Sequence, residues 1–178
     1  LTLVKDEKVS FRFVYAAGTD KKVLDAIDAL LLDLEVSGVE TTRVEDTVAG
    51  EGVEILVGAD VNREGCKVDL LAVGEGGYII RVIGNKIVIA GGSVDATQEA
   101  IEFFAAEYIK AGEKKIKNLT VAKNINVEKK TEYKVTSVKV AGKNINDYTI
   151  VADEKDTYAA AQAQVFQAAL YSRSGIFL

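Results

Sequence analysis

The chain has 178 residues, of which 48% are hydrophobic and 28% are charged, and its formal net charge is −5. This composition is typical of a globular protein and excludes an intrinsically disordered chain. The acidic balance argues against nucleic acid as a partner, because neutralising phosphates requires clustered lysine and arginine. The sequence has no histidine, which excludes Ser–His and Cys–His nucleophilic pairs and His-bearing zinc sites within this chain. No apolar run reaches the ~18 residues of a membrane span, and Cys66 is the single cysteine, so no intrachain disulfide can form.

Residues 9–38 predict a strand followed by a helix. Residues 9–16 combine partial alternation with aromatic and β-branched side chains, which favours a strand. After Gly18, either Thr19 or Asp20 can cap a helix, and Ser37-Gly38 ends it. Between these signals an apolar stripe follows the helical spacing and indicates a core-facing helix; its members are Val23, Ala26, Ile27, Leu30, Leu31 and Leu34.

The middle of the chain predicts strands joined by one long connection. Residues 41–47 are polar and fit a short edge strand, whereas residues 54–57 are apolar and short enough for a buried strand. Residues 59–76 contain three glycines and are assigned to a surface connection. Residues 78–83 and 86–90 flank Gly84-Asn85, which can supply the positive φ angles of a tight hairpin turn.

The last part of the chain predicts a second helix and then a partial repeat. The helix spans about residues 95–110, with strand-like segments at 119–127 and 134–140 after it. Residues 148–152 and a helix from about 157 to 172 then repeat the strand–helix order of residues 11–36. We therefore expect a complete α+β module at 1–112, a strand-containing linker at 113–134, and the incomplete beginning of a second, similar module at 135–178.

The Gly91-Gly92-Ser93 turn is the strongest candidate for a binding feature. It lies between a predicted strand and a predicted helix, and helix N-termini bind anions through their free N–H groups. The turn lacks both the Gly-x-x-x-x-Gly-Lys-Ser/Thr pattern and the Gly-x-Gly-x-x-Gly pattern of phosphate-binding loops. A tight turn with an N-cap serine is the favoured interpretation, and a small ligand-binding or enzymatic domain that uses this turn is the alternative.

The acidic residues give no catalytic or metal-binding pattern. Most lie on the polar faces of the predicted helices, where solvated surface explains them; these are Asp25, Asp28, Asp33, Glu99 and Glu102. The carboxylates at Asp60, Glu64 and Asp69 lack the Asp-x-Asp-x-Asp-Gly spacing of a calcium loop. Cys66 fits a small, partly buried filling residue better than a reactive thiol. We therefore assign no catalytic, cofactor-binding or metal-binding residue, and we expect no cofactor.

Four segments of the chain resemble a known module. They are residues 54–58 with Asn62-Arg63, residues 77–82, residues 85–93, and a helix that carries Phe103-Phe104. Together they resemble the non-catalytic α+β domain that precedes the barrel in family 20 hexosaminidases and α-glucuronidases, which also occurs in secreted proteins of gut bacteria. Residues 138–151 are similar to the entry strand of such modules, so the resemblance covers residues 1–112 and, as an incomplete copy, 135–178.

The resemblance implies an architecture and a context. The architecture is a two-layer mixed sheet with helices packed on one face and the other face free for a neighbouring domain. The context is extracellular or at the cell surface, with neighbouring domains of the same polypeptide, and glycan, as expected partners. The leading interpretation is a non-catalytic accessory or spacer module of a secreted bacterial carbohydrate-active or surface protein, and this segment is not expected to be an enzyme. A purely structural tandem repeat is a further alternative.

Overall fold

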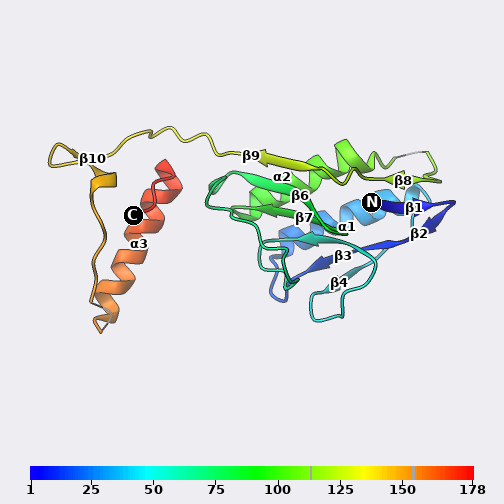
Figure 1. The fold of residues 1–178 in the computed structure, drawn as a ribbon, viewed down its shortest axis with the longest axis horizontal. Helices are drawn as coiled ribbons and strands as arrows, with labels where there is room; N and C mark the ends of the chain where they lie inside the picture. The colour runs from blue at the N-terminus through cyan, green and yellow to red at the C-terminus, as the bar shows by residue number, and fades with distance from the viewer. Residues whose placement is uncertain (113, 154) are drawn as a thin grey trace. The chain divides into compact units, whose positions relative to one another are not determined.

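The chain forms two units in the structure, which is a computed structural model describing residues 1–112, 114–153 and 155–178. The first unit is Leu1–Lys130 and the second is Thr131–Leu178. Figure 1 shows the course of the chain through the elements of each unit. No helix within the described residues is both long and apolar enough to cross a bilayer. The two units are described separately below.

A six-stranded mixed sheet is the frame of the first unit. Its first four strands in spatial order run parallel, and the hairpin strand β6 is antiparallel to both of its neighbours. The spatial order is β4 (Arg43–Glu45), β3 (Phe11–Tyr15), β5 (Val53–Val57), β7 (Lys86–Gly91), β6 (Tyr78–Ile83) and β9 (Asn126–Lys129). A smaller antiparallel sheet has the order β2 (Lys8–Val9), β1 (Thr2–Lys5) and β8 (Leu119–Thr120).

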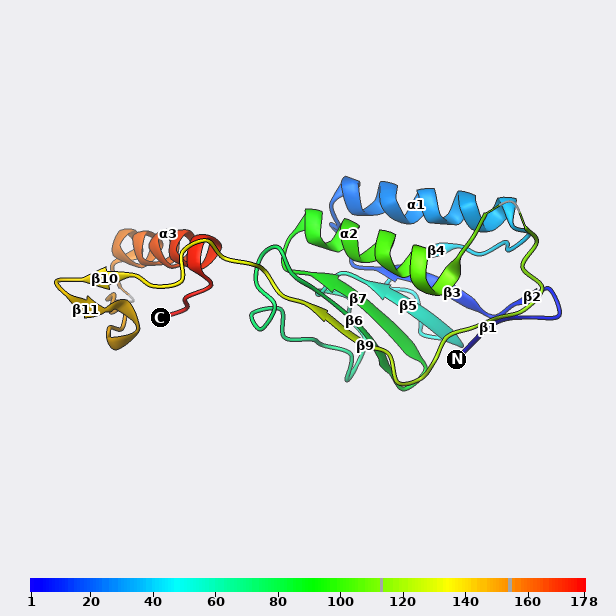
Figure 2. The ribbon, with the colours of Figure 1, turned by 90° about the horizontal axis from the view of Figure 1, so that it is seen from above.

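Two helices lie side by side over one face of the large sheet, as Figure 2 shows. Helix α1 (Lys21–Val36) begins after Asp20, whose side chain accepts a hydrogen bond from the Lys22 N–H. Helix α2 (Val94–Phe104) begins after Ser93, whose side chain accepts from the Ala96 N–H, and it continues as a π-helical turn η1 (Ala105–Ile109). The structure thus confirms the expected α+β class with both helices on one face of a mixed sheet.

The core between the helices and the sheet follows the strand alternation. Every second residue of β3, β5 and β7 points toward the helices, including the fully buried Phe13, Ile55 and Ile89. The stripe predicted for α1 supplies the facing layer, since its four buried positions are Val23, Ile27, Leu30 and Leu34. Both apolar clusters of the first unit are formed only by residues within its own bounds.

The opposite face of the sheet is not free, which corrects the expectation of an open face. Residues 58–77 cross it, and their side chains Val61 and Cys66 pack on Val14, Leu56 and Val88 of the sheet. The glycines of residues 59–76 predicted a surface connection. Its spaced apolar side chains nevertheless bury part of the sheet, because an uncovered row of Val14, Leu56 and Val88 would face water.

Two strands of the first unit come from the segment expected as a linker. Strand β8 pairs with β1, and β9 pairs with β6 at the edge of the large sheet. The first unit therefore extends to Lys130, whereas the expected module ended at residue 112. Residue 113, the first of the expected linker, lies outside the described residues.

The second unit contains a short hairpin and one long helix. The hairpin strands are β10 (Lys139–Val140) and β11 (Lys143–Asn144), followed by the 3-10 turn η2 (Ile145–Asp147) and helix α3 (Thr157–Ser174). The helix prediction for residues 157–172 is confirmed. The strand prediction for residues 148–152 is wrong for this chain, because an extended segment becomes a strand only when a neighbour accepts its hydrogen bonds, and no described segment pairs with it.

The beginnings of the two units share more than the order of their elements. In each unit a hairpin with a two-residue turn precedes an extended segment and an Asp-capped helix. The turn residues all have positive φ: 49° and 64° at Asp6 and Glu7, and 49° and 80° at Ala141 and Gly142. Positive φ at both central positions is the geometry that matches the right-handed twist of hairpin strands.

Candidate functional site

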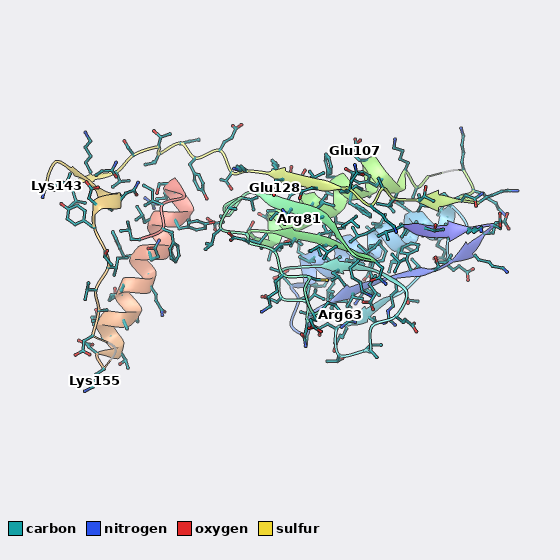
Figure 3. The ribbon with its side chains drawn as sticks, in the orientation of Figure 1. Arg63, Arg81, Glu107, Glu128, Lys143 and Lys155 are labelled. Carbon is teal, nitrogen blue, oxygen red and sulfur yellow. The ribbon has the colours of Figure 1, made fainter. Side chains whose placement is uncertain are left out.

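A buried carboxylate on the sheet face away from the helices is the centre of the most organised polar cluster. Three charged residues stand in register on adjacent parallel strands, Arg12 on β3, Glu54 on β5 and Lys86 on β7. Because alternate residues of a strand point to the same face, their side chains meet on the side away from α1 and α2. Arg63 reaches Glu54 from the segment that crosses this face, and Figure 3 labels it. We call these four residues the Glu54 cluster.

Each basic member of the Glu54 cluster contacts the carboxylate directly. Arg12 Nη2 lies 2.7 Å from Glu54 Oε1, and Arg63 Nε lies 2.9 Å from Glu54 Oε2. Lys86 Nζ lies 2.8 Å from the same Oε2 atom. The Glu54 side chain is 0% exposed, and those of its three partners are 11–15% exposed. One buried anion is therefore surrounded by three nearly buried cations.

The environment fixes the protonation state of Glu54. Burial alone would raise the pKa of its carboxyl, but hydrogen bonds from Arg63, Lys86 and Arg12 outweigh burial and lower the pKa to about 2. The same partnership raises the pKa of Arg63. Glu54 is thus a carboxylate at any physiological pH. A group with so low a pKa is a poor general acid or base, since catalysis favours a pKa near the working pH.

The remaining donors of the cluster hold two loops against the sheet. Arg63 donates to the backbone carbonyls of Asp46 at 2.7 Å and Val48 at 2.8 Å. Arg12 donates to the Ala49 carbonyl and, through Nη1, to Glu51 at 3.1 Å. The cluster therefore fastens residues 46–51 and the crossing segment to the strands. Its arrangement fits a structural role better than chemistry on a substrate.

The Glu54 cluster was not among the predicted features, although the sequence carries a signal for it. Arg12, Glu54 and Lys86 each lie within or at the start of an otherwise apolar strand. A charge inside a buried strand requires a partner. The register of the strands, which the sequence did not supply, identifies which partners meet.

The glycines of the Gly91-Gly92-Ser93 turn allow neighbouring backbone to pack closely against it. A Cβ atom on Gly91 would lie 2.3 Å from the Thr97 backbone nitrogen, and one on Gly92 would lie 2.1 Å from the Gly74 carbonyl oxygen. The Gly91 N–H donates to Thr97 Oγ1 at 3.1 Å. Ser93 caps α2, as predicted. The turn also borders a hollow of about 330 Å³ at the carboxyl ends of β3, β5 and β7, but the chain's own backbone occupies the space that the glycines leave.

The carboxylates singled out in the sequence are dispersed over the surface. Asp25 pairs with Lys21 at 2.6 Å, Asp28 with Arg43 at 2.5 Å, and Glu99 with Lys129 at 2.5 Å. Asp33 and Glu102 are exposed on α1 and α2. Asp60, Glu64 and Asp69 are likewise not gathered with other ligands, because no group of three or more Cys, Asp or Glu side chains within the described residues could hold a metal ion.

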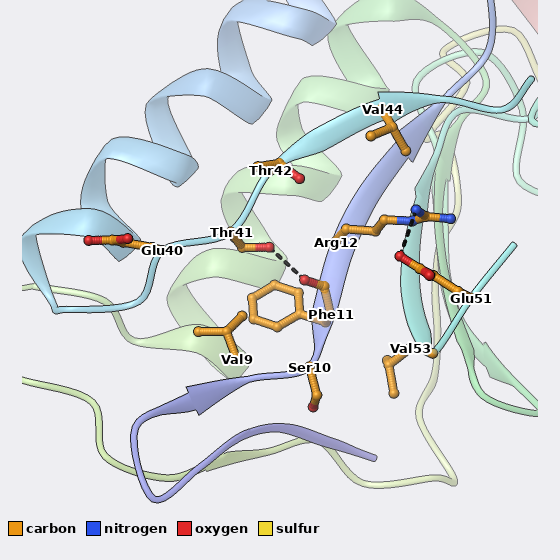
Figure 4. A pocket seen from close by; sticks show the side chains of 11 residues that line it. Val9, Ser10, Phe11, Arg12, Glu40, Thr41, Thr42, Val44, Glu51 and Val53 are labelled. Carbon is orange, nitrogen blue, oxygen red and sulfur yellow. Dashed lines mark hydrogen bonds and ion pairs between the residues drawn. The ribbon is translucent and has the colours of Figure 1, made fainter. Parts of the chain in front are cut away.

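A second polar feature is a hollow of about 500 Å³ at the amino ends of β3 and β5, shown in Figure 4. It is bordered by residues 9–12, by residues 40–42 before β4, and by residues 51–53 before β5. The Arg12–Glu51 ion pair stands on one side of it, and the Thr41 hydroxyl donates to the Phe11 carbonyl at 2.6 Å.

On the same sheet, the exposed pair Arg81 and Glu128 joins β6 to β9 at 2.7 Å, as labelled in Figure 3.

Comparison with solved structures finds a likeness to one part of an enzyme. The chain is similar to part of a family GH115 4-O-methyl-α-glucuronidase, BtGH115A, with specificity for decorated arabinogalactans, at a TM-score of 0.51 and 17% sequence identity. The match covers 72% of this chain and only 18% of that enzyme. The likeness shows that this chain shares an α+β fold with one part of that enzyme.

Two further likenesses have lower scores. A GH138 enzyme that targets pectin rhamnogalacturonan II matches at a TM-score of 0.40 and 13% identity over 61% of this chain and 11% of its own. CpGH84D matches at a TM-score of 0.39 and 18% identity over 57% of this chain and 17% of its own. No protein-family profile matches the sequence. No curated protein matches it by sequence either.

Proposed function

We propose that this chain is a non-catalytic accessory or spacer module of a secreted bacterial protein that acts on, or lies next to, glycans. The observation that carries the proposal is the likeness to a glucuronidase, which covers 72% of this chain but 18% of the enzyme. A fold that recurs as a small part of a large glycoside hydrolase is suited to a supporting role there. The location outside the cell belongs to the same proposal.

The use of charge in the first unit supports this proposal. Its most buried ionisable group, Glu54, has every contact directed to its own chain, and those contacts fasten loops to the sheet. Catalytic carboxylates of glycosidases need access to the glycosidic bond and often a raised pKa. Glu54 has neither, since it is 0% exposed and its pKa is lowered to about 2.

The second unit supports the tandem-module part of the proposal. It repeats the hairpin, turn geometry, extended segment and Asp-capped helix of the first unit. Several of its large apolar side chains are exposed, with Val151 at 89% and Phe166 at 50%. In the first unit the equivalent strand and helix are covered by further strands and a second helix. We infer that residues 135–178 are the beginning of a second, similar module. A purely structural tandem repeat is the alternative to an accessory role for this chain.

The proposal is tested with the 178-residue chain, a glycan array and a hydrolysis assay. The substrates are arabinogalactan, xylan, pectin and chitin oligosaccharides, and the products are quantified by anion-exchange chromatography. We expect no product above that of a heat-denatured sample. Sustained release of sugar from any substrate would overturn the non-catalytic assignment. Binding without release would separate the accessory role from a purely structural repeat.

A further inference from the structure

The hollow at the amino ends of β3 and β5 has the volume of a small-molecule site. Its volume of about 500 Å³ lies within the range of about 300–1,000 Å³ typical of ligand pockets. The amino ends of parallel strands are separate from the edge that carries the Gly91-Gly92-Ser93 turn. The hollow therefore differs from the site that the sequence motif suggested.

Polar groups stand on both sides of this hollow. Figure 4 shows Glu40 on the side of α1 and the Arg12–Glu51 pair on the opposite side. Glu40 and Thr42 are both exposed, and in Figure 4 the Glu40 carboxylate is directed away from the Arg12–Glu51 pair. The Thr42 hydroxyl can donate a hydrogen bond to a ligand or accept one from it.

Arg12 is a rigid donor, whereas its partner Glu51 is exchangeable. The Arg12 guanidinium donates a hydrogen bond of 2.7 Å from Nη2 to Oε1 of the fully buried Glu54. Its Nη1 atom lies 3.1 Å from Glu51, and both residues line the hollow. Because Glu51 is 78% exposed, its contact with Arg12 costs little to rearrange. A ligand hydroxyl can then bridge Glu51 and Arg12.

Apolar side chains complete the lining between the polar groups. Val44 is partly exposed on the same sheet face as Arg12, whereas Val9 and Val53 pack against the core on the helix side. A flat, partly apolar ligand with hydroxyl groups along its edge would cover Val44 and satisfy the polar groups beside it. Pyranose rings have this character, since their C–H faces are apolar and their edges carry hydroxyls.

The balance of charge selects among ligands. Among the residues that line the hollow, Glu40 and Glu51 are acidic and Arg12 alone is basic. This lining is less favourable to an anionic ligand than to a neutral one. We propose that this hollow binds a neutral saccharide unit, with Glu51, Arg12 and Thr42 as its hydrogen-bonding groups. This inference rests on the proposed accessory role next to glycans and supplies a site for it.

The test is a titration of the ¹⁵N-labelled 178-residue chain, followed by NMR, with neutral arabinogalactan and xylan oligosaccharides and with glucuronic acid. We expect amide shifts confined to residues 9–12, 40–44 and 51–53 for a neutral sugar. Glu51→Gln and Thr42→Val should each weaken binding about three- to tenfold, the effect of losing one hydrogen bond. Glu107→Gln, an exposed carboxylate on η1 that does not line the hollow, should leave the affinity unchanged.

Several results would overturn the inference. They are the absence of amide shifts with every neutral sugar, amide shifts centred on another surface, and tighter binding of glucuronic acid than of the neutral oligosaccharides. An equal loss in Glu107→Gln and Glu51→Gln would have the same meaning. None of these results involves hydrolysis, so they contradict the saccharide site without contradicting the proposed accessory role, which only sugar release would overturn.

Discussion

Replacement of Glu54 by glutamine tests the structural role of the Glu54 cluster. Glutamine keeps the shape of the side chain but removes the charge, leaving Arg12, Arg63 and Lys86 nearly buried without their anion. Removing one partner of a buried ion pair costs about 3–5 kcal/mol. The lowering of the Glu54 pKa from 4.5 to about 2 gives a similar figure of about 3 kcal/mol at 1.36 kcal/mol per pH unit.

The same substitution has a signature in the pH dependence of stability. The pKa of Glu54 is lowered on folding, so its contribution is fully present above the unfolded pKa of about 4.5. That contribution is lost as the pH falls through the folded value of about 2. The wild-type chain should therefore have a higher free energy of unfolding than Glu54→Gln by a constant amount near neutral pH. This difference in stability should disappear between about pH 4.5 and pH 2.

The assay is urea denaturation followed by circular dichroism at pH 7 and at intervals down to pH 2. Urea is preferred to guanidinium because it does not screen the ion pairs. Glu51→Gln is the matched control, since Glu51 contacts the same Arg12 but is 78% exposed, and it should change stability by less than about 0.5 kcal/mol. Equal stabilities of Glu54→Gln and wild type at pH 7 would refute the account of the cluster, as would a difference that persists unchanged at pH 2.

The remaining predictions concern other parts of the chain. Gly91→Ala should lower the free energy of unfolding, measured by urea denaturation, by about 1–3 kcal/mol, because its Cβ would lie 2.3 Å from the Thr97 backbone nitrogen. Gly112→Ala, with open space around it, should change this free energy little. Equal effects of the two substitutions would contradict the close packing of Gly91. Glu7→Gly should stabilise the chain by about 0.5–1 kcal/mol because Glu7 has a φ of 64°, and a loss of stability would refute this. Cys66 is buried and burial raises the pKa of its thiol, so a thiol reagent at pH 8 should label it slowly until urea unfolds the chain; fast labelling of the native chain would contradict its place in the core. A chain ending at Lys130 should keep the wild-type unfolding midpoint of the first unit, because both apolar clusters lie within it, and a large drop would mean that the second unit contributes to that core.

The sequence was sufficient for features that depend on local periodicity and turn chemistry. The apolar stripe of α1 and the Gly84-Asn85 hairpin were predicted and are present, and Asp20 is one of the two residues predicted as the cap of α1. Each of these signals lies within a few turns of helix or a few residues of strand. The predicted Ser93 cap is of the same kind.

Features that depend on long-range pairing could not be predicted. The pairing of β9 with β6 joins residues more than 40 positions apart, and no local pattern indicates it. The Glu54 cluster likewise needs the parallel register of β3, β5 and β7. For residues 148–152 the error had the opposite sense, since a strand-like sequence has no pairing partner among the described residues.

The most direct test of the non-catalytic role is a product-release assay at high concentration of the 178-residue chain over a long incubation. Arabinogalactan is the first substrate, because the similar glucuronidase has specificity for decorated arabinogalactans. The account predicts that sugar release equals that of the heat-denatured chain. Release that rises linearly with chain concentration and persists through repeated purification would contradict it.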